Sequence, residues 1–152
     1  MATIITRERP DTPESILLID ELESHLASFY PQENRFGYSV EKLIQQGVAF
    51  FVTRLDGVPA GCGGVQFFGA EYGELKRMFV RSQFRGLGLG KLMLEHLENF
   101  ARRHNIPLLR LETGIHQKEA IGLYEHMGYR TCPPFGEYKA TPLNVFFDKK
   151  IK

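Results

Sequence analysis

The sequence predicts that residues 1–152 form a single α/β domain whose central sheet is mixed and mostly antiparallel, with about four flanking helices. Three observations support this prediction. Apolar segments between residues 48 and 80 alternate with turn signals, as antiparallel strands do. An amphipathic segment over residues 88–104 then separates two strand-like segments, and this order requires a crossover between parallel strands. A second amphipathic segment, over residues 118–128, adds a further helix before the last strands.

Length and composition suit one globular domain. The chain has 152 residues, of which 43% are hydrophobic and 12% aromatic, enough for one apolar core. The formal net charge is +1, but residues 1–70 carry a net charge of −4 and residues 71–152 a net charge of +5. This imbalance is too modest and too dispersed for a nucleic-acid surface. It is compatible with an anionic ligand bound by the second half of the chain.

The sequence shows no signal typical of a secreted, membrane or metal-binding protein. Its start, MATIITRERP, lacks an apolar signal core, and no stretch reaches the roughly 18 apolar residues that a membrane span requires. Cys62 and Cys132 form no CxxC pair, and the five histidines have no metal-ligand spacing. We therefore expect a cytoplasmic protein with reduced thiols, no bound metal and no membrane partner.

The first half of the chain contains local signals for five elements. We expect a strand over residues 2–9, a helix over 13–29, a short helix over 39–47, and strands over 48–55 and 59–68. The longer helix has an apolar stripe formed by Leu18, Leu22, Leu26 and Phe29. Ser39 can cap the short helix, and Gly47 can end it. Asp56 and Gly57 form the turn signal of a hairpin between the two strands.

The second half contains six further elements. We expect strands over 74–80, 107–113, 129–131 and 144–150, and helices over 88–104 and 118–128. The apolar faces of these helices consist of Leu89, Leu92, Met93, Leu97, Phe100 and Ala101 in the first, and of Ala120, Ile121, Tyr124 and Met127 in the second. Because a helix separates them, strands 74–80 and 107–113 are expected to be parallel neighbours.

The alternation of apolar residues breaks inside the strand over 74–80. Leu75 and Phe79 share one parity, whereas Met78 and Val80 share the other, so the break falls near Arg77 and Met78. A β-bulge would produce this pattern. A strand buried on both faces would produce it too, and the pattern alone leaves both interpretations open.

Residues 81–97, RSQFRGLGLGKLMLEHL, place three glycines at alternate positions before the long helix. A helix N-terminus leaves about four backbone N–H groups without partners and carries partial positive charge. Gly86, Gly88 and Gly90 would let these groups approach an oxyanion, and Arg85 and Lys91 would add charge. The segment therefore predicts a phosphate-binding turn, with a flexible glycine-rich loop as the structural alternative.

Two other phosphate-binding patterns fit less well. A P-loop has a Ser or Thr after the lysine, but Leu92 follows Lys91, so nucleotide hydrolysis is not expected. A dinucleotide fold requires GxGxxG, and Gly90 comes one place too early for it. Glu112, at the end of the next strand, does mimic the acid that binds ribose, so a dinucleotide ligand stays open as a rival.

At three ordered motifs the chain resembles the GNAT superfamily of acetyl-CoA-dependent N-acetyltransferases. RGLGLG over residues 85–90 matches the acyl-CoA motif of that family, while ELKRMFVRSQF precedes it and AIGLYEHMGYR follows it at suitable spacing. The resemblance covers roughly residue 47 to the C-terminus. It implies a GNAT-type fold in which the parallel strands over 74–80 and 107–113 splay apart.

The resemblance also implies acetyl-CoA as the cosubstrate and assigns the residues that bind it. Main-chain groups of Met78, Phe79 and Val80 would pair with the pantetheine arm at the splayed edge. The implied diphosphate contacts are Arg85, Gly86, Leu87, Gly88, Leu89, Gly90 and Lys91. Many members have an asparagine where this chain has Gln117, so Gln117 is expected to contact the cofactor through a longer arm.

The implied reaction is direct transfer of acetyl to a primary amine of a small molecule or protein within a ternary complex. Glu74 matches a general base of some members, and Glu112 is the second candidate. A backbone N–H near Val80 would stabilise the developing oxyanion. Tyr124 matches the tyrosine that protonates the leaving sulfur, and a core aromatic is the structural alternative. A ping-pong reaction through Cys62 is possible but not required.

The sequence does not identify the acceptor. Its pocket is expected from residues 29–43 and 132–142, and the side chains that favour a mixed aromatic and polar pocket are Tyr30, Arg35, Phe36, Tyr38, Phe135 and Tyr138. Arg35 would hold a carboxylate, whereas the acidic first helix would attract a polyamine or a lysine. The resemblance is compatible with a homodimer and with a non-catalytic module of the same fold that senses acyl-CoA.

Overall fold

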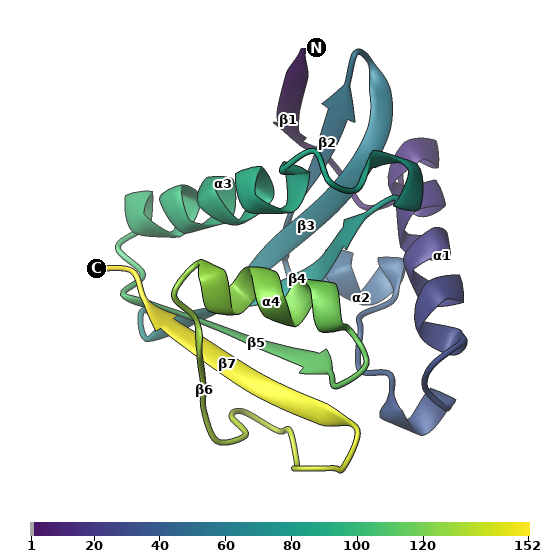
Figure 1. The fold of residues 1–152 in the computed structure, drawn as a ribbon. Coiled ribbons are helices and arrows are strands. Elements are labelled where there is room, and N and C mark those ends of the chain that lie inside the picture. Colours follow the sequence, from purple (N-terminus) through teal and green to yellow (C-terminus); the bar gives the residue numbers. More distant parts are fainter. Residues whose placement is uncertain (1) are drawn as a thin grey trace.

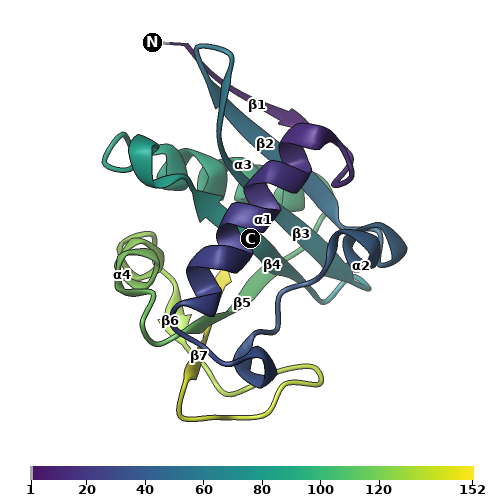
Figure 2. The same ribbon diagram turned by 90° about the vertical axis from the view of Figure 1, so that its right-hand side faces the viewer.

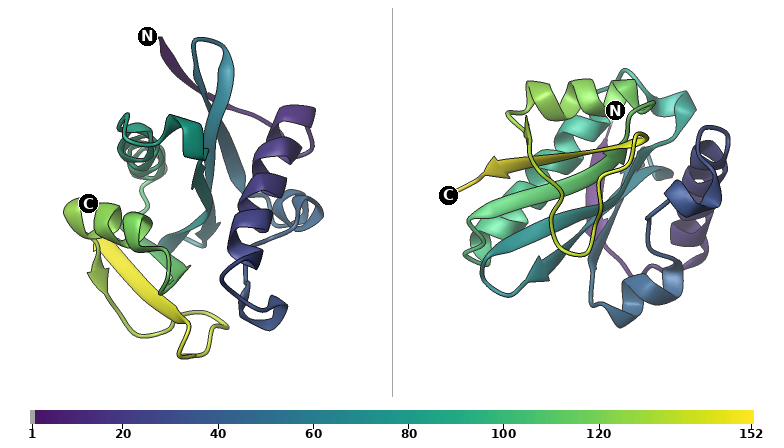
Figure 3. Two further views of the ribbon diagram at one scale, coloured as in Figure 1. Left: turned by 45° about the vertical axis from the view of Figure 1, so that its right-hand side comes forward. Right: turned by 90° about the horizontal axis from the view of Figure 1, so that it is seen from below.

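The computed structural model describes residues 2–152, which form one seven-stranded sheet covered by helices on both faces (Figure 1). The strands are β1 (Thr3–Arg7), β2 (Ala49–Leu55), β3 (Val58–Phe68), β4 (Tyr72–Val80), β5 (Leu108–Gly114), β6 (Arg130–Thr131) and β7 (Asn144–Lys150). The helices are α1 (Pro13–Ala27), α2 (Val40–Gln45), α3 (Leu89–Arg103) and α4 (Lys118–His126). Helices α1 and α2 lie over one face of the sheet (Figure 2), and α3 and α4 over the other (Figure 3).

The sheet has the strand order β1-β2-β3-β4-β5-β7-β6. Within residues 2–152, every neighbouring pair is antiparallel except β4 and β5, which are parallel. The mixed sheet and its parallel pair are therefore confirmed. The predicted turn between β2 and β3 is also confirmed, because Asp56 and Gly57 both have positive φ angles, 50° and 83°, as a type I′ hairpin turn requires.

Strand β4 leaves its parallel neighbour after two paired residues. Gly73 pairs with Leu109 and Glu74 with Arg110, and in the described chain no later residue of β4 pairs with β5. Figure 1 shows the arrowheads of the two strands pointing apart. The splayed pair expected from the family resemblance is thus present. It leaves an edge of backbone N–H and C=O groups open in the middle of the sheet.

A β-bulge interrupts β4 at the predicted position. The register against β3 shifts between Cys62 and Gly64, where Arg77 and Met78 both oppose Gly63. Arg77 has a φ of 53°, a left-handed conformation that is uncommon for a residue with a side chain. The bulge is therefore confirmed. The strand is also buried on both faces over residues 72–77, so the two interpretations that the pattern left open both hold.

The bulge places two consecutive cations on one face of the sheet. In a regular strand successive side chains point to opposite faces. Here the Lys76 ammonium lies 3.8 Å from the centre of the Tyr38 ring, and Arg77 Nε donates a hydrogen bond to the Tyr38 carbonyl oxygen at 2.9 Å. Met78 packs against the opposite face, in the core beneath α3 and α4. Both cations therefore face the side of α1 and α2.

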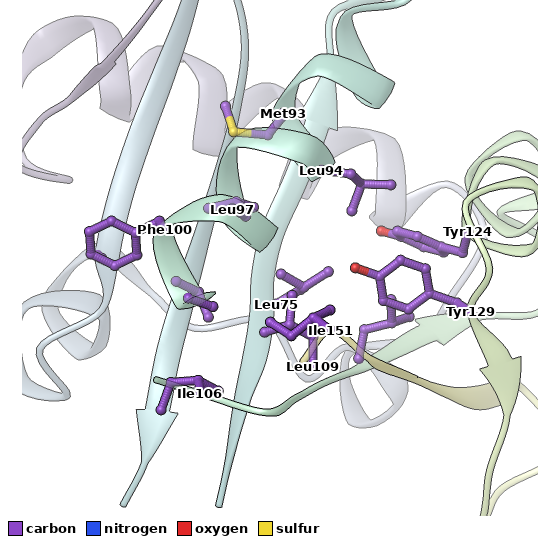
Figure 4. Packing of buried hydrophobic residues seen from close by; sticks show 14 of the residues in the cluster. Leu75, Met93, Leu94, Leu97, Phe100, Ile106, Leu109, Tyr124, Tyr129 and Ile151 are labelled. Atoms are coloured by element: carbon purple, nitrogen blue, oxygen red, sulfur yellow. The ribbon is translucent and has the colours of Figure 1, made fainter. Parts of the chain in front are cut away.

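The core has one main cluster on each face of the sheet. The cluster beneath α3 and α4, shown in Figure 4, includes Leu94, Leu97 and Leu109, which are fully buried. The prediction for Leu92 was wrong, because its side chain is 42% exposed. At 100° per residue, position 92 points away from the stripe that runs through Leu97, whereas Leu94 points into the core.

The end of the first helix also differs from its prediction. Helix α1 ends at Ala27 with Ser28 as its C-cap, so Phe29 lies beyond the helix and its side chain is exposed. Leu18 and Leu22 of the predicted stripe are buried. Among residues 2–152, no helix combines the length and the apolar character that crossing a membrane would need. The two cysteines are not bonded to each other.

Candidate active site

A cavity of about 480 Å³ lies where β4 separates from β5. Its walls come from α1, the last residues of β4, the start of α3, and α4 with the residues before it. The volume falls within the range of roughly 300 to 1,000 Å³ that is typical of ligand pockets. The predicted cofactor residues that line it are Met78, Phe79, Val80, Arg85, Gly86, Gly88, Leu89, Gly90, Lys91, Gln117 and Tyr124. Leu87 is not among the lining residues and its side chain is exposed.

The first turn of α3 forms one wall of this cavity. Gly88 is the N-cap, with φ 78°, and no side chain of the described residues caps this helix. Apart from the residues next to it in the chain, a Cβ atom at Gly86 or Gly88 would meet no atom of residues 2–152 within 4 Å, so both glycines border open space. The backbone N–H groups of the turn are therefore accessible, and Arg85 and Lys91 add positive charge beside them. This arrangement fits a diphosphate.

The bulged end of β4 forms the adjoining wall. Residues 78–80 line the cavity at the height where β4 has already lost its pairing with β5. Their free main-chain groups can pair with an extended ligand that carries amides. The wall and the turn together fit a ligand with a charged diphosphate and a flexible amide chain.

Gln117, the N-cap of α4, contacts both α1 and the segment that follows it. Its Oε1 accepts a hydrogen bond from the Tyr30 hydroxyl at 3.0 Å, and its Nε2 lies 3.1 Å from His25 Nε2. The same Tyr30 oxygen accepts a hydrogen bond from the His116 backbone N–H at 2.9 Å. The amide expected to contact the cofactor thus also bridges two segments about 90 residues apart. The sequence offered no signal for this bridge.

A second cavity of about 130 Å³ adjoins the first. The residues that line both cavities are Leu22, Met78, Gln117, Ala120 and Tyr124. Four of the side chains predicted to surround an acceptor line the second cavity, namely Tyr30, Arg35, Phe36 and Tyr138. Two others, Tyr38 and Phe135, are not among its lining residues. The structure therefore brings both catalytic candidates and part of the predicted acceptor pocket to one junction.

Glu74, the first candidate for the general base, is held in a buried ion pair. Its side chain is 4% exposed, and its Oε2 lies 2.7 Å from Lys76 Nζ. The same oxygen accepts a hydrogen bond of 2.6 Å from the Tyr138 hydroxyl. Burial lowers the pKa of Lys76, and the Glu74 carboxylate opposes this shift. To act as a general base, Glu74 would have to give up this ion pair.

Glu112, the second candidate, lines the same cavity. Burial and the nearby Glu74 carboxylate raise the pKa of Glu112 to about 7, while the Lys76 ammonium opposes the rise. A carboxyl group with this pKa exchanges protons readily at neutral pH. Glu112 can therefore accept a proton from a ligand in the second cavity without breaking an ion pair.

Tyr124 is placed at the junction of the two cavities by α4. Its ring centre lies 5.8 Å from that of Tyr129 in an edge-to-face arrangement, beside Leu94 of α3 (Figure 4). Burial, and secondarily the negative charge of Glu112, raise the pKa of Tyr124. The phenol therefore keeps its proton at neutral pH and can act as a donor to a group in the first cavity.

Cys62 does not reach either cavity. It is fully buried, burial raises its pKa to about 12, and its thiol donates a hydrogen bond to the Arg77 carbonyl oxygen at 3.3 Å. A covalent intermediate on this cysteine therefore has no structural support. The cations that line the second cavity and that sequence reasoning did not single out are Lys76 and Arg77. Two consecutive cations at the predicted bulge were the signal that could have indicated them.

Comparison with known proteins gives consistent similarities. A family model described as acetyltransferase (GNAT) family matches residues 15–129. An IAA acetyltransferase from Azospirillum brasilense is 36% identical over 148 residues, covering 97% of each chain. A solved structure from Klebsiella pneumoniae, assigned as an acyl-CoA N-acyltransferase, has a TM-score of 0.84 with 34% identity and covers 99% of this chain and 98% of its own. The fold is also similar, with a TM-score of 0.77 and 18% identity, to the PaiA N-acetyltransferase of Thermoplasma acidophilum in complex with coenzyme A, over 99% of each chain.

Proposed function

The chain belongs to the acetyltransferase (GNAT) family, and on that premise we propose that it transfers an acetyl group from acetyl-CoA to a primary amine by direct attack in a ternary complex. One observation carries the proposal. A cavity of cofactor size and a small cavity with a titratable carboxyl group meet at a buried tyrosine, Tyr124. Two reactants can therefore bind at once, with a proton acceptor and a proton donor at their junction.

The larger cavity fits coenzyme A. The open N–H groups of the first turn of α3, together with Arg85 and Lys91, would hold the diphosphate. The free edge of β4 over residues 78–80 would pair with the pantetheine amides. When bound, acetyl-CoA supplies an acetyl group activated as a thioester. The protein's part is to position it and to move the protons of the reaction.

The first proton comes from the acceptor. A free alkylamine has a pKa of about 10, so it is mostly protonated near pH 7 and must lose a proton before it can attack. Glu112, with a pKa of about 7, is the better acceptor of this proton, and Glu74 is held in its ion pair with Lys76. Glu74 then acts through its charge, which keeps the pKa of Glu112 high.

The second proton goes from the Tyr124 hydroxyl to the departing sulfur, and the proton that the nitrogen loses as the amide forms restores the Tyr124 hydroxyl. The negative charge of Glu112 contributes to the raised pKa of Tyr124. Once Glu112 has taken the proton of the amine it is neutral, and this contribution disappears. Tyr124 thus becomes a stronger acid at the stage when the leaving group needs a proton, which couples the two transfers.

Acetyl transfer is tested by following thiol release from acetyl-CoA with a panel of primary amines, and with the IAA named for the Azospirillum relative. We expect turnover with at least one amine and none without an acceptor. Binding of coenzyme A is measured separately by calorimetry. Tight binding with no turnover for any acceptor would indicate an acyl-CoA sensor. Stabilisation by NADH in place of coenzyme A would indicate a dinucleotide ligand.

Substitution of Gly88 by alanine tests the diphosphate contact. The side chain would border the open cavity at a φ of 78°, so we expect the dissociation constant of coenzyme A to rise by on the order of tenfold or more. Gly69→Ala is the matched control, because Gly69 also has a positive φ, 59°, and open space around its Cβ, but it does not line the cavity. Equally weakened binding of coenzyme A in both variants would mean that general backbone strain explains the effect.

A further inference from the structure

Arg77 lines the second cavity with unused hydrogen-bonding capacity. Its side chain is 3% exposed, its Nε donates to the Tyr38 carbonyl oxygen, and its Nη2 donates to Glu23 Oε1. Nη1 is buried and has no hydrogen-bond partner among residues 2–152. An N–H group of a buried cation without a partner is unfavourable, so native proteins rarely leave one. The arrangement therefore requires an explanation.

Arg35 repeats this feature from a different segment. Its Nη1 donates to Glu23 Oε2 at 3.1 Å, and its side chain is 21% exposed. Its Nε is buried and, like Arg77 Nη1, finds no partner in the part of the chain that the structure describes. One carboxylate, that of Glu23, is thus shared by two guanidinium groups. The pair retains a net positive charge beside the cavity.

The position of Arg77 is maintained at a cost in backbone energy. Its φ of 53° is unfavourable for a residue with a side chain, and such strain occurs preferentially at functional sites. Gly37 makes room for its guanidinium, since a Cβ atom there would lie 2.1 Å from Arg77 Nη1. A bulge and a glycine, from segments 40 residues apart, therefore cooperate to seat this cation beside the cavity.

The other charged groups of the cavity already have roles. Glu74 and Lys76 are paired with each other, and Glu112 is the proton acceptor of the proposed reaction. A polyamine would bring additional positive charge beside the two arginines, and like charges repel. The cavity volume of about 130 Å³ lies well below the roughly 300 to 1,000 Å³ of pockets for drug-sized ligands. The site therefore favours a small acceptor with one negative group.

From these observations we infer that the acceptor is a small amino acid whose carboxylate is bound by Arg77 and Arg35. Guanidinium groups bind carboxylates through strong charge-assisted hydrogen bonds, and the free N–H groups of these two residues supply the donors. The carboxylate would be held by the arginines while the amine faces Glu112 and the thioester. This inference rests on the proposed acetyl transfer, which it makes specific.

The test compares each acid with its own amide. Thiol release from acetyl-CoA is measured with glycine, alanine, β-alanine and γ-aminobutyrate, each beside its carboxamide, and with spermidine. We expect kcat/KM for at least one acid to exceed that for its amide by on the order of 10- to 100-fold. Without a carboxylate site, the carboxamide would react faster at neutral pH. Its amino group has the lower pKa, so a larger fraction of it is unprotonated and able to attack. Equal or faster reaction of all amides, or turnover of spermidine alone, would overturn the inference.

Two variants connect the preference to the arginines. Arg35→Gln should raise KM for the acid on the order of 10-fold or more, with little change in kcat and in the kinetics of the amide. Arg81→Gln is the matched control, because Arg81 also pairs with α1, through Glu21 at 3.0 Å, but does not line the second cavity. Arg77→Lys retains the positive charge but removes the planar guanidinium group. It should show the same rise in KM for the acid, without a rise for the amide. An equal loss of kcat/KM for the acid and for its amide would indicate that the arginines have a merely structural role.

The failure of acetyl transfer and the failure of this inference give different results. If acids and amides are acetylated equally, the carboxylate site is wrong and acetyl transfer stands. If no amine reacts although coenzyme A binds, acetyl transfer fails, and carboxylate binding is then read from the melting temperature of the coenzyme A complex. The site would be supported if β-alanine, but not its amide, raises the melting temperature and if Arg35→Gln abolishes this rise. No stabilisation by any of the four acids would overturn it.

Discussion

Replacement of Tyr124 by phenylalanine is expected to lower kcat for acetyl transfer by on the order of 100-fold or more, with little change in the affinity for coenzyme A. The ring is buried at the junction of the two cavities and the substitution removes only the hydroxyl group, so packing is retained. What is lost is the proton donor for the departing sulfur. Steady-state thiol release and calorimetric binding of coenzyme A measure the two quantities.

The neighbouring Tyr129 provides the matched control. Its ring packs against that of Tyr124, but its hydroxyl donates to Glu98 Oε2 at 2.8 Å and it lines neither cavity. Tyr129→Phe should lower the melting temperature, since it removes a buried hydrogen bond to a charged group, and should leave kcat nearly unchanged. An unchanged kcat in Tyr124→Phe would show that Tyr124 is only a core residue.

Replacement of Glu112 by glutamine is expected to lower kcat/KM near pH 8 by on the order of 100-fold or more. It should also abolish the acidic limb of the pH profile. In the native enzyme kcat/KM should rise with pH through a midpoint near 7, because only the deprotonated carboxylate accepts a proton and its pKa is about 7. A second limb, from the acceptor amine itself, lies at higher pH and persists in the variant.

Glu74→Gln distinguishes the two carboxylates. The negative charge of Glu74 helps to raise the pKa of Glu112, so its removal should shift the acidic limb to lower pH without abolishing it. If Glu74→Gln abolishes the limb and Glu112→Gln retains it, Glu74 is the general base.

The stability of Glu112→Gln gives a reading that does not depend on turnover. The folded-state pKa of Glu112 lies above its ordinary value of 4.5, so ionisation of this group opposes folding. Its contribution to stability is complete below pH 4.5 and is lost as the pH rises through about 7. The melting temperature of the variant relative to the native protein should therefore rise between pH 5 and pH 8. A constant difference would mean that the pKa of Glu112 is not raised.

The features that the sequence predicted correctly depend on interactions between residues close in the chain. The Asp56–Gly57 turn requires positive φ angles, and the start of α3 follows from glycines before an apolar repeat. The break in apolar alternation near Arg77 indicated either a bulge or a strand buried on both faces, and the bulge is present. The wrong prediction that Leu92 is buried also has a local cause, because several apolar residues of α3 could have been assigned to its buried face.

The sequence by itself determined the mixed sheet, the glycine turn before α3 and the set of candidate residues, because backbone preferences and motifs act over a few residues. The tertiary structure decided which candidates share a cavity. It left Leu87 in solvent, paired Glu74 with Lys76, and raised the pKa of Glu112. It also brought Arg35 beside Arg77 around one shared carboxylate. Burial and charge around a side chain depend on segments far apart in the chain, and only the folded structure brings those segments together.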